Sequence, residues 1–234
     1  MAELGTDPRC PWSWQTMGRG RCAAGVLHSP HRIQRCQEVL VTSGLERIIR
    51  MAVESPDTSL GFVLPDISLP DASGELVSVR SQGAAATLIA FVCNHCPYVK
   101  HVEGLFGEVA SSYMAKGVAI RGIVSNDVES YPDDGPEGMK DQASRAGWTF
   151  PYLQDRDQSF AKELGAVCTP DLFLFDRDNV LVYRGAFDES SPKNGVPLTG
   201  DHLIRALDFT LEGSEVPLPH RRAIGCSIKW IPQA

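Results

Sequence analysis

The chain has 234 residues, of which 43% are hydrophobic and 22% charged, and its formal net charge is −7. This composition is typical of a globular protein with a sizeable core, and it excludes a wholly disordered chain, a collagen and a coiled coil. The acidic balance argues against a dedicated nucleic-acid-binding protein. No apolar run approaches the length of a transmembrane helix.

The first 50 residues differ from the rest in charge. They contain seven arginines, no lysine and four acidic residues, whereas the remainder is strongly acidic. This segment contains no apolar stretch followed by a small-residue cleavage site, so we expect no secretory signal. Its many arginines are compatible with an organellar transit peptide. The sequence that begins at Met51 looks like the ordinary start of a protein. We therefore predict an extension over residues 1–50 that is disordered or non-native, with a short helix at 33–50 as the alternative, and one domain over residues 51–234.

Hydrophobic periodicity predicts the first elements of this domain. Two short strands flank the turn sequence PDASGE, a continuous apolar run forms a buried central strand, an amphipathic helix follows, and a second buried strand comes next. The predicted ranges are 62–69 and 76–79 for the hairpin, 87–93 and 118–124 for the buried strands, and 98–116 for the helix.

An acidic loop then leads into a helix at 136–146, with Asp134 as a plausible N-cap. The later elements are a strand at 150–153, a helix at 158–165, a hairpin of strands 171–175 and 180–183, a helix at 198–212, and an irregular tail. Alternating strands and helices indicate a central sheet covered on both faces. The terminal hairpin makes that sheet mixed, so we predict an α/β protein with a thioredoxin fold and an N-terminal β-hairpin extension.

The main chemical signal is the tetrad Cys93-Asn94-His95-Cys96, which stands between the buried strand and the long helix. This spacing brings two thiols close enough for a disulfide, and a helix N-terminus stabilises a thiolate. A structural zinc site usually requires a second such pair, so a metal is the weaker interpretation. Inert buried thiols are the other alternative.

Six segments resemble the peroxiredoxin-like branch of the thioredoxin superfamily, which includes alkyl hydroperoxide reductase and thiol-specific antioxidant-like domains. They cover most of residues 51–230 in order. The segments are LPDISLPDASGELVSV, FVCNHCPYVKH, SNDVESYPDDGPEGM, GAVCTPDLFLFD, VYRGAFDES and GCSIKW. The resemblance implies a cis peptide at Thr169-Pro170 beside the redox cysteines, where these two residues would shape the substrate groove.

The resemblance leaves the roles of the two cysteines open. In thioredoxin-like motifs the first cysteine attacks and the second resolves. This order assigns Cys93 as nucleophile and Cys96 as resolving thiol, and we favour it. The pair Cys96-Pro97 instead matches a peroxidatic cysteine at a helix start. A peroxiredoxin site also has a Thr or Ser three residues before that cysteine and a Pro seven before, where this chain has Cys93 and Ile89. His95 is a candidate for tuning the Cys93 thiolate.

Other residues have secondary roles in this interpretation. Cys168 and Cys226 are candidates for further redox thiols, and they could pair with each other, although sequence cannot fix that pairing. Asn126 ends a buried strand at its carboxyl edge, where sites of open α/β sheets gather. Arg184 and Asp188 are expected to form an ion pair.

The sequence therefore predicts a thiol–disulfide oxidoreductase that cycles Cys93 and Cys96 between dithiol and disulfide. The odd number of cysteines fits a reducing compartment, so we expect the protein in the cytoplasm. We expect no organic cofactor and no metal, disulfides or peroxides as substrates, and a thiol electron donor, with neither nucleic acid nor membrane as partner. The alternatives are a thiol peroxidase with Cys96 peroxidatic, and a redox-sensing or chaperone-like binding module.

Overall fold

The computed structural model describes residues 52–56 and 60–232. The predicted extension over residues 1–50, including the alternative helix at 33–50, lies outside these ranges. Among the described residues, no helix combines the length and the apolar character needed to cross a membrane.

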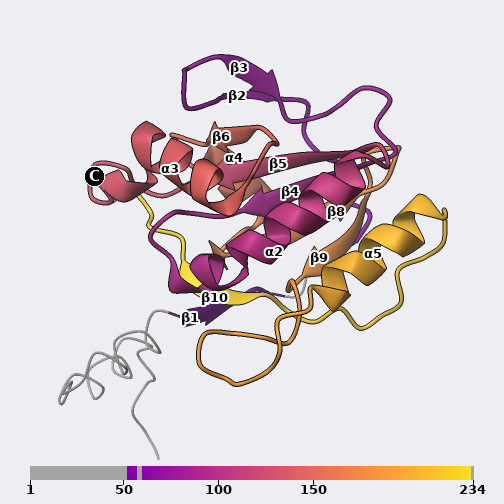
Figure 1. The fold of residues 1–234 in the computed structure, drawn as a ribbon. Coiled ribbons are helices and arrows are strands. Elements are labelled where there is room, and N and C mark those ends of the chain that lie inside the picture. Colours follow the sequence, from indigo (N-terminus) through magenta and orange to yellow (C-terminus); the bar gives the residue numbers. More distant parts are fainter. Residues whose placement is uncertain (1–51, 57–59, 233–234) are drawn as a thin grey trace, which may run out of the picture. The chain divides into compact units, whose positions relative to one another are not determined.

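A five-stranded mixed sheet forms the centre of the domain (Figure 1). Its strands lie in the order β6-β5-β4-β8-β9; β4 pairs in parallel with β5, and β5 with β6, whereas β8 runs antiparallel to both β4 and β9. The strands are β4 (Ala86–Phe91), β5 (Val118–Val124), β6 (Tyr152–Gln154), β8 (Asp171–Phe175) and β9 (Leu181–Gly185). The predicted mixed sheet is confirmed.

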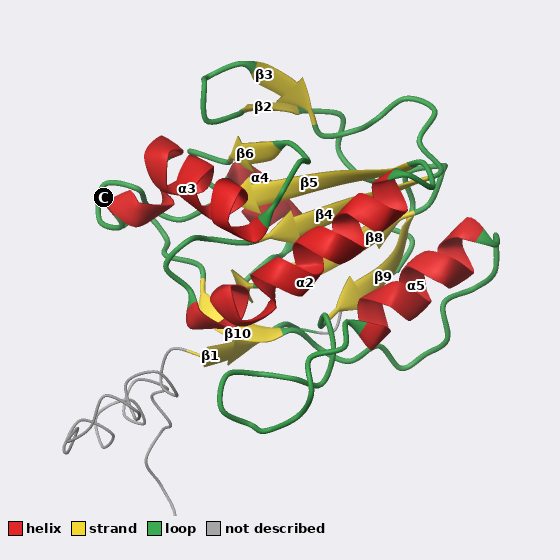
Figure 2. Cartoon of the chain, in the orientation of Figure 1, coloured by secondary structure: helices red, strands yellow, loops and turns green. Residues whose placement is uncertain are grey.

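Helices cover both faces of this sheet (Figure 2). The long helix α2 and the last helix α5 lie on one face, where α3 packs against α2, and α4 lies on the other face. The helices are α2 (Pro97–Met114), α3 (Pro136–Ala146), α4 (Ser159–Leu164) and α5 (Asp201–Leu211), and a 3-10 turn, η1 (Pro132–Asp134), precedes α3. Each α-helix overlaps a predicted helix, and α3 has the predicted bounds.

The central strand β4 is buried along its whole length, as its apolar run predicts. Successive side chains of a strand point to opposite faces. Leu88 and Ala90 accordingly join the apolar cluster beneath α2 and α5, whereas Ile89 and Phe91 join the cluster beneath α4. The two cores fix the end of β4, from which the cysteine tetrad continues.

The predicted N-terminal hairpin is also present, with shorter strands. It consists of β2 (Ser68–Pro70) and β3 (Leu76–Ser78), which pair antiparallel. The carboxylate of Asp71 accepts hydrogen bonds from the backbone N–H of Ser73 and Glu75 and closes the turn. The turn residues of the sequence thus form the expected structure.

The prediction of a wholly irregular tail is wrong. Residues Ile224–Ser227 form a strand, β10, between β1 (Ala52–Glu54) and β7 (Cys168–Thr169), and both of its pairings are antiparallel. A short segment containing glycine and serine gives no periodic apolar signal, so the pairing depends on tertiary contacts.

Gly225 permits this pairing, because the strand approaches the backbone at Thr169 and Pro170 very closely. A Cβ atom at position 225 would lie 1.9 Å from the carbonyl oxygen of Thr169 and 3.1 Å from the nitrogen of Pro170. Backbone atoms cannot give way as a flexible side chain could. Position 225 therefore requires glycine for a close approach of two backbones.

We predict that Gly225→Ala lowers the melting temperature and loosens the tail strand. The matched control is Gly104→Ala on the exposed face of α2, where an added Cβ meets no atom within 4 Å. That control should stabilise the protein by roughly 1 kcal/mol, because alanine is the better helix former. Thermal melts and amide hydrogen exchange of residues 224–227 measure both effects. Equal melting temperatures for the two variants would contradict the prediction.

Candidate functional site

The cysteine tetrad lies at the carboxyl end of β4, where the chain turns into α2. Cys96 is the N-cap residue of α2, and Pro97 occupies the first helical position. Proline suits that position because its fixed φ is helical and its missing N–H would have no partner there. Cys93 and Cys96 are 1% and 0% exposed. Two thiols are thereby held, buried, at a helix N-terminus.

Thr169 lies across the site from both sulfur atoms. The Cys93 sulfur is 3.4 Å from the Thr169 hydroxyl, and the Cys96 thiol donates a hydrogen bond of 3.2 Å to the Thr169 carbonyl oxygen. The expected cis peptide at Thr169-Pro170 is present. The structure thus brings the pair Cys93 and Cys96 together with the pair Thr169 and Pro170. The two pairs are more than 70 residues apart in the sequence.

The tail contributes a third thiol to this cluster. β10 pairs Cys226 with Thr169, and the Cys226 side chain is buried. Cys93, Cys96 and Cys226 belong to one apolar cluster. All four described cysteines are free thiols.

Cys168 points away from this cluster. It stands opposite Ser227 in the β7–β10 pair, one position from Thr169, and neighbouring residues of a strand face opposite sides. Its thiol lies 3.9 Å from the carbonyl oxygens of Pro170 and Ala223. Burial raises the pKa of Cys168, and the charge of Asp171 adds to the rise. The register therefore argues against pairing of Cys168 with Cys226.

The expected ion pair between Arg184 and Asp188 is not formed. The Arg184 guanidinium instead lies 2.7 Å from the Asp171 carboxylate on the adjacent strand β8, and both side chains are buried. The Asp188 carboxylate accepts hydrogen bonds from the backbone N–H groups of Thr199 and Gly200. Strand pairing, which sequence adjacency does not reveal, decides the partner.

Asp134 is the residue that the sequence interpretation misplaced. It does not cap α3, whose N-cap is Gly135, but lies fully buried beneath the tetrad. Its carboxylate accepts hydrogen bonds from the backbone N–H groups of Asn94 and His95 at 2.8 and 3.2 Å, and from the Asn126 amide at 2.8 Å. The carboxylate thus fixes the backbone between the two cysteines. Its position after the acidic loop at the carboxyl edge of β5 is the available sequence signal.

His95 interacts with this carboxylate and forms no hydrogen bond to the Cys93 sulfur among the described contacts. The His95 Nδ1 atom lies 2.6 Å from Asp134, and the ring stacks on Tyr131 with centroids 5.0 Å apart. Its Nε2 atom is buried without a partner in the described residues. The predicted tuning of Cys93 by His95 therefore has no hydrogen bond to carry it among the described contacts.

A second support comes from α3. Gln142 donates a hydrogen bond to the Cys93 carbonyl oxygen at 3.2 Å and accepts one from the Tyr152 hydroxyl at 3.0 Å. The Arg145 guanidinium donates to the Asn94 side chain at 2.9 Å and to Glu103 on α2. The helix α3, which follows β5, thus holds the tetrad from the side, and no sequence pattern predicts these contacts of Gln142 and Arg145.

The two motif thiols have opposite electrostatic environments. Burial raises the pKa of Cys93, and the hydrogen bond with Cys96 and the charge of Asp134 raise it further. Burial also opposes ionisation of Cys96, but hydrogen bonds from Cys226, Cys93 and Thr169 outweigh it and hold the pKa of Cys96 below its usual range. The α2 N-terminus acts in the same direction. The environment favours Cys96 as the thiolate, whereas the motif order favoured Cys93.

A metal could use part of this site. The Cys93 sulfur, a ring nitrogen of His95 and a carboxylate oxygen of Asp134 lie within 4.8 Å of one another. Sulfur and imidazole ligands suit zinc. However, the Asp134 oxygens already accept hydrogen bonds from both backbone and side-chain donors, which a metal would have to displace. The donor set therefore fits hydrogen bonding to the tetrad better than metal coordination.

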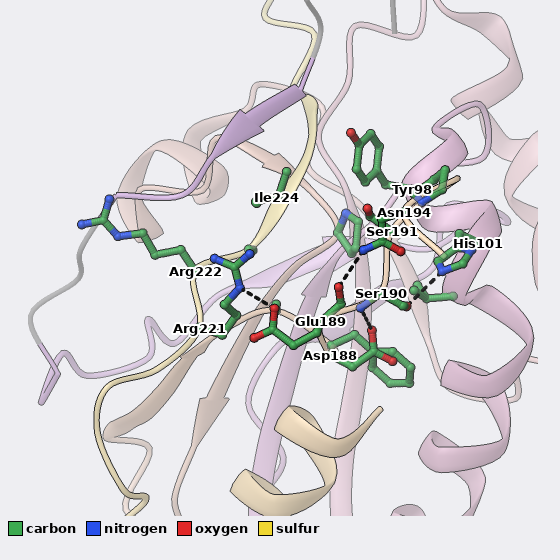
Figure 3. A pocket seen from close by; sticks show the side chains of 16 residues that line it. Tyr98, His101, Asp188, Glu189, Ser190, Ser191, Asn194, Arg221, Arg222 and Ile224 are labelled. Carbon is green, nitrogen blue, oxygen red and sulfur yellow. Dashed lines mark hydrogen bonds and ion pairs between the residues drawn. The ribbon is translucent and has the colours of Figure 1, made fainter. Parts of the chain in front are cut away.

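A cavity of about 90 Å³ is lined by residues that neighbour the site cysteines and Thr169 in the chain (Figure 3). Tyr98, Pro170 and Ile224 line it, each within two residues of a site cysteine or of Thr169. A Glu189–Arg221 ion pair with a 3.1 Å separation lies on its other side. The volume is below that of typical pockets for small molecules and suits a single side chain.

We predict that Asp134→Asn lowers the pKa of Cys93, because the substitution removes the nearby negative charge. It should also destabilise the protein by about 1–3 kcal/mol, because buried N–H donors lose part of their acceptor. The control is Asp133→Asn, which changes the exposed residue next to Asp134. Chemical denaturation and the pH dependence of Cys93 alkylation, resolved by mass spectrometry, measure both effects. An unchanged Cys93 profile in Asp134→Asn would contradict the assignment.

We also predict that the reduced protein carries a thiolate at Cys96 at neutral pH. A lowered pKa means that ionisation is complete at pH values below the ordinary thiol pKa of about 8.5. The ultraviolet absorbance of the thiolate should therefore persist as the pH falls through neutrality, and Cys96→Ser should abolish that component. Persistence of the component in Cys96→Ser and its loss in Cys93→Ser would reverse the assignment.

Comparison with solved structures shows two similar proteins. An uncharacterised conserved protein of Geobacillus kaustophilus is 49% identical, with a TM-score of 0.74 over 78% of this chain and 98% of its own. A hypothetical protein of Sinorhizobium meliloti 1021 is 39% identical, with a TM-score of 0.75 over 77% of this chain and 99% of its own. None of the curated proteins matches the chain.

A more distant structure supports the fold. A Chlorobium tepidum protein, named as a candidate thiol:disulfide interchange protein DsbE, is 17% identical, with a TM-score of 0.52 over 66% of this chain and 99% of its own. Residues 60–184 match the AhpC/TSA family. This match spans more than half of the sequence, from the N-terminal hairpin through the cysteine tetrad to β9. The chain is therefore a peroxiredoxin-like domain of the thioredoxin superfamily and belongs to the AhpC/TSA family.

Proposed function

We propose that this protein is a thiol–disulfide oxidoreductase in which Cys93 and Cys96 cycle between dithiol and disulfide. The observation that carries the proposal is the environment of the Cys96 sulfur, which lies at a helix N-terminus with thiol and hydroxyl donors around it. A stabilised thiolate next to a second thiol is the arrangement needed for disulfide exchange. The names of its distant structural neighbours are consistent with this chemistry.

In the proposed reaction the Cys96 thiolate attacks one sulfur of a substrate disulfide. A mixed disulfide forms, and the other substrate sulfur leaves as a thiolate. Cys93 then loses its proton and attacks the Cys96 sulfur, and the second substrate thiol leaves. Overall, the protein dithiol and R–S–S–R′ give the protein disulfide, RSH and R′SH, with two electrons passing to the substrate. A thiol donor must reduce the protein again.

The proposal reverses the order that the motif favoured. Attack requires a thiolate, and Asp134 and burial both oppose ionisation of Cys93. The resolving thiol, by contrast, can remain protonated until the mixed disulfide has formed. Because both sulfurs are buried, the substrate disulfide must enter by a local movement. The cavity lined by Pro170 and Tyr98 is the entrance that we propose.

A thiol peroxidase is the second candidate, and the Cys96-Pro97 pair at the start of α2 favours it. In that reaction the Cys96 thiolate takes an oxygen atom from a hydroperoxide, giving a sulfenic acid and an alcohol. Cys93 would condense with the sulfenic acid to give the disulfide and water. Cys93 stands where peroxiredoxins have a Thr or Ser, so the hydroxyl that positions the peroxide is missing from that place.

We predict that Cys96→Ser loses the first step and Cys93→Ser keeps it. Reduced variants, each also carrying Cys10→Ser, Cys22→Ser and Cys36→Ser, are mixed with one equivalent of an aromatic disulfide that releases a coloured thiolate. Release should slow at least a hundredfold in Cys96→Ser and by less than tenfold in Cys93→Ser. A mixed disulfide on Cys93 in Cys96→Ser would instead assign the attack to Cys93.

The same variants distinguish the other candidates. A hydroperoxide that oxidises Cys96 faster than the disulfide does, with a sulfenic acid detected by mass spectrometry, would favour the peroxidase. Equal release by both variants and the wild-type protein would contradict both redox functions and favour a binding module. The wild-type chain is run beside them as the reference.

A further inference from the structure

We infer that Cys226 is a second resolving thiol, which closes a Cys96–Cys226 disulfide as an alternative to Cys93–Cys96. This inference rests on the proposed function, because it requires that Cys96 forms the mixed disulfide. It assigns a redox role to the tail strand, which lies outside the matched region of residues 60–184.

The strand register places Cys226 beside Cys96. Cys226 stands directly opposite Thr169, whose carbonyl oxygen accepts the hydrogen bond from the Cys96 thiol at 3.2 Å. Directly opposite residues of an antiparallel pair point to the same face. Gly225 lets the two backbones approach, and β10 also packs against α2. Three segments thus converge on the Cys96 sulfur.

The two thiols share one buried cluster. The Cys226 and Cys96 thiols each shift the pKa of the other, and both side chains are buried among the same apolar residues. Buried sulfur atoms of one cluster need little chain movement to form a bond. Cys168, which is adjacent to Thr169 in the chain, faces the other side of the strand pair, so position 226 is distinguished by geometry and not by cysteine content.

The charges around Cys226 favour its action in the second step. The hydrogen bond to Cys96 raises the pKa of Cys226, as does burial, whereas the charge of Lys229 lowers it. Once Cys96 is part of a mixed disulfide it carries no negative charge, so the largest opposing contribution disappears. Lys229 then assists ionisation of Cys226, whereas Asp134 continues to oppose ionisation of Cys93.

The step balances without a further reagent. The Cys226 thiolate attacks the Cys96 sulfur of the mixed disulfide, a Cys96–Cys226 bond forms, and the Cys96–substrate bond breaks. The substrate sulfur leaves as a thiolate and takes the proton that Cys226 lost. The two protein thiols are oxidised by two electrons, and the substrate disulfide is reduced to two thiols.

The test measures the second thiol released by the Cys93→Ser variant in the background without Cys10, Cys22 and Cys36. With an equimolar, symmetrical aromatic disulfide, we expect a first equivalent of coloured thiolate from attack and a second from resolution. Peptide mapping should then find a Cys96–Cys226 linkage. Adding Cys226→Ser should keep the first release, although slower because the Cys96 thiolate loses a thiol donor. It should slow the second release at least tenfold further than the first and preserve the mixed disulfide on Cys96.

The matched control is Cys93→Ser with Cys168→Ala, which removes the neighbouring thiol on the other face and should keep the second release. If Cys93→Ser gives the first equivalent but holds the mixed disulfide as long as the variant lacking Cys226, the inference is wrong and the proposed function stands. If the first equivalent itself is missing, the proposed function fails and the inference fails with it. Circular dichroism of each variant verifies folding.

Peptide mapping of the wild-type protein after treatment with one equivalent of disulfide gives an independent readout. The absence of any Cys96–Cys226 peptide in this map would contradict the inference.

Discussion

The close approach of β10 to the peptide between Thr169 and Pro170 is the constraint on which the site depends. A side chain at Gly225 would collide with the Thr169 carbonyl, which also accepts the hydrogen bond from Cys96. One peptide unit therefore sets the positions of the α2 N-terminus and of the tail strand. The placement of the cysteine side chains, on which the proposed disulfide exchange depends, follows from this packing.

Two charges of opposite sign then give the three thiols different environments. The charge of the buried Asp134 carboxylate raises the pKa of Cys93, and the charge of the Lys229 ammonium group lowers the pKa of Cys226. Hydrogen bonds from Cys226, Cys93 and Thr169 lower the pKa of Cys96. In a buried site such interactions are weakly screened, so a single carboxylate can decide which thiol ionises. The same carboxylate fixes the tetrad backbone, which couples the shape of the site to its electrostatics.

The elements that periodicity predicts well are those whose signal is local. The buried strand β4 and the helix α3 follow directly from an apolar run and from an amphipathic pattern with a helix-ending glycine. The tail strand has neither signal, because its four residues are stabilised by pairing with β1 and β7. Sequence proximity predicts that Asp134 caps the nearest helix, since the distant N–H groups that its carboxylate accepts from are not adjacent in the chain.

The sequence by itself determined the thioredoxin fold, the redox tetrad and its partner pair Thr169-Pro170, because these are carried by local patterns and by motifs in a fixed order. Only the tertiary structure decided that Cys226 shares the buried cluster of Cys96 while Cys168 faces away, that Arg184 pairs with Asp171, and that the environment favours Cys96 over Cys93 as thiolate. The physical reason is that strand register, burial and the direction of hydrogen bonds arise from contacts between segments far apart in the chain, which no local pattern encodes.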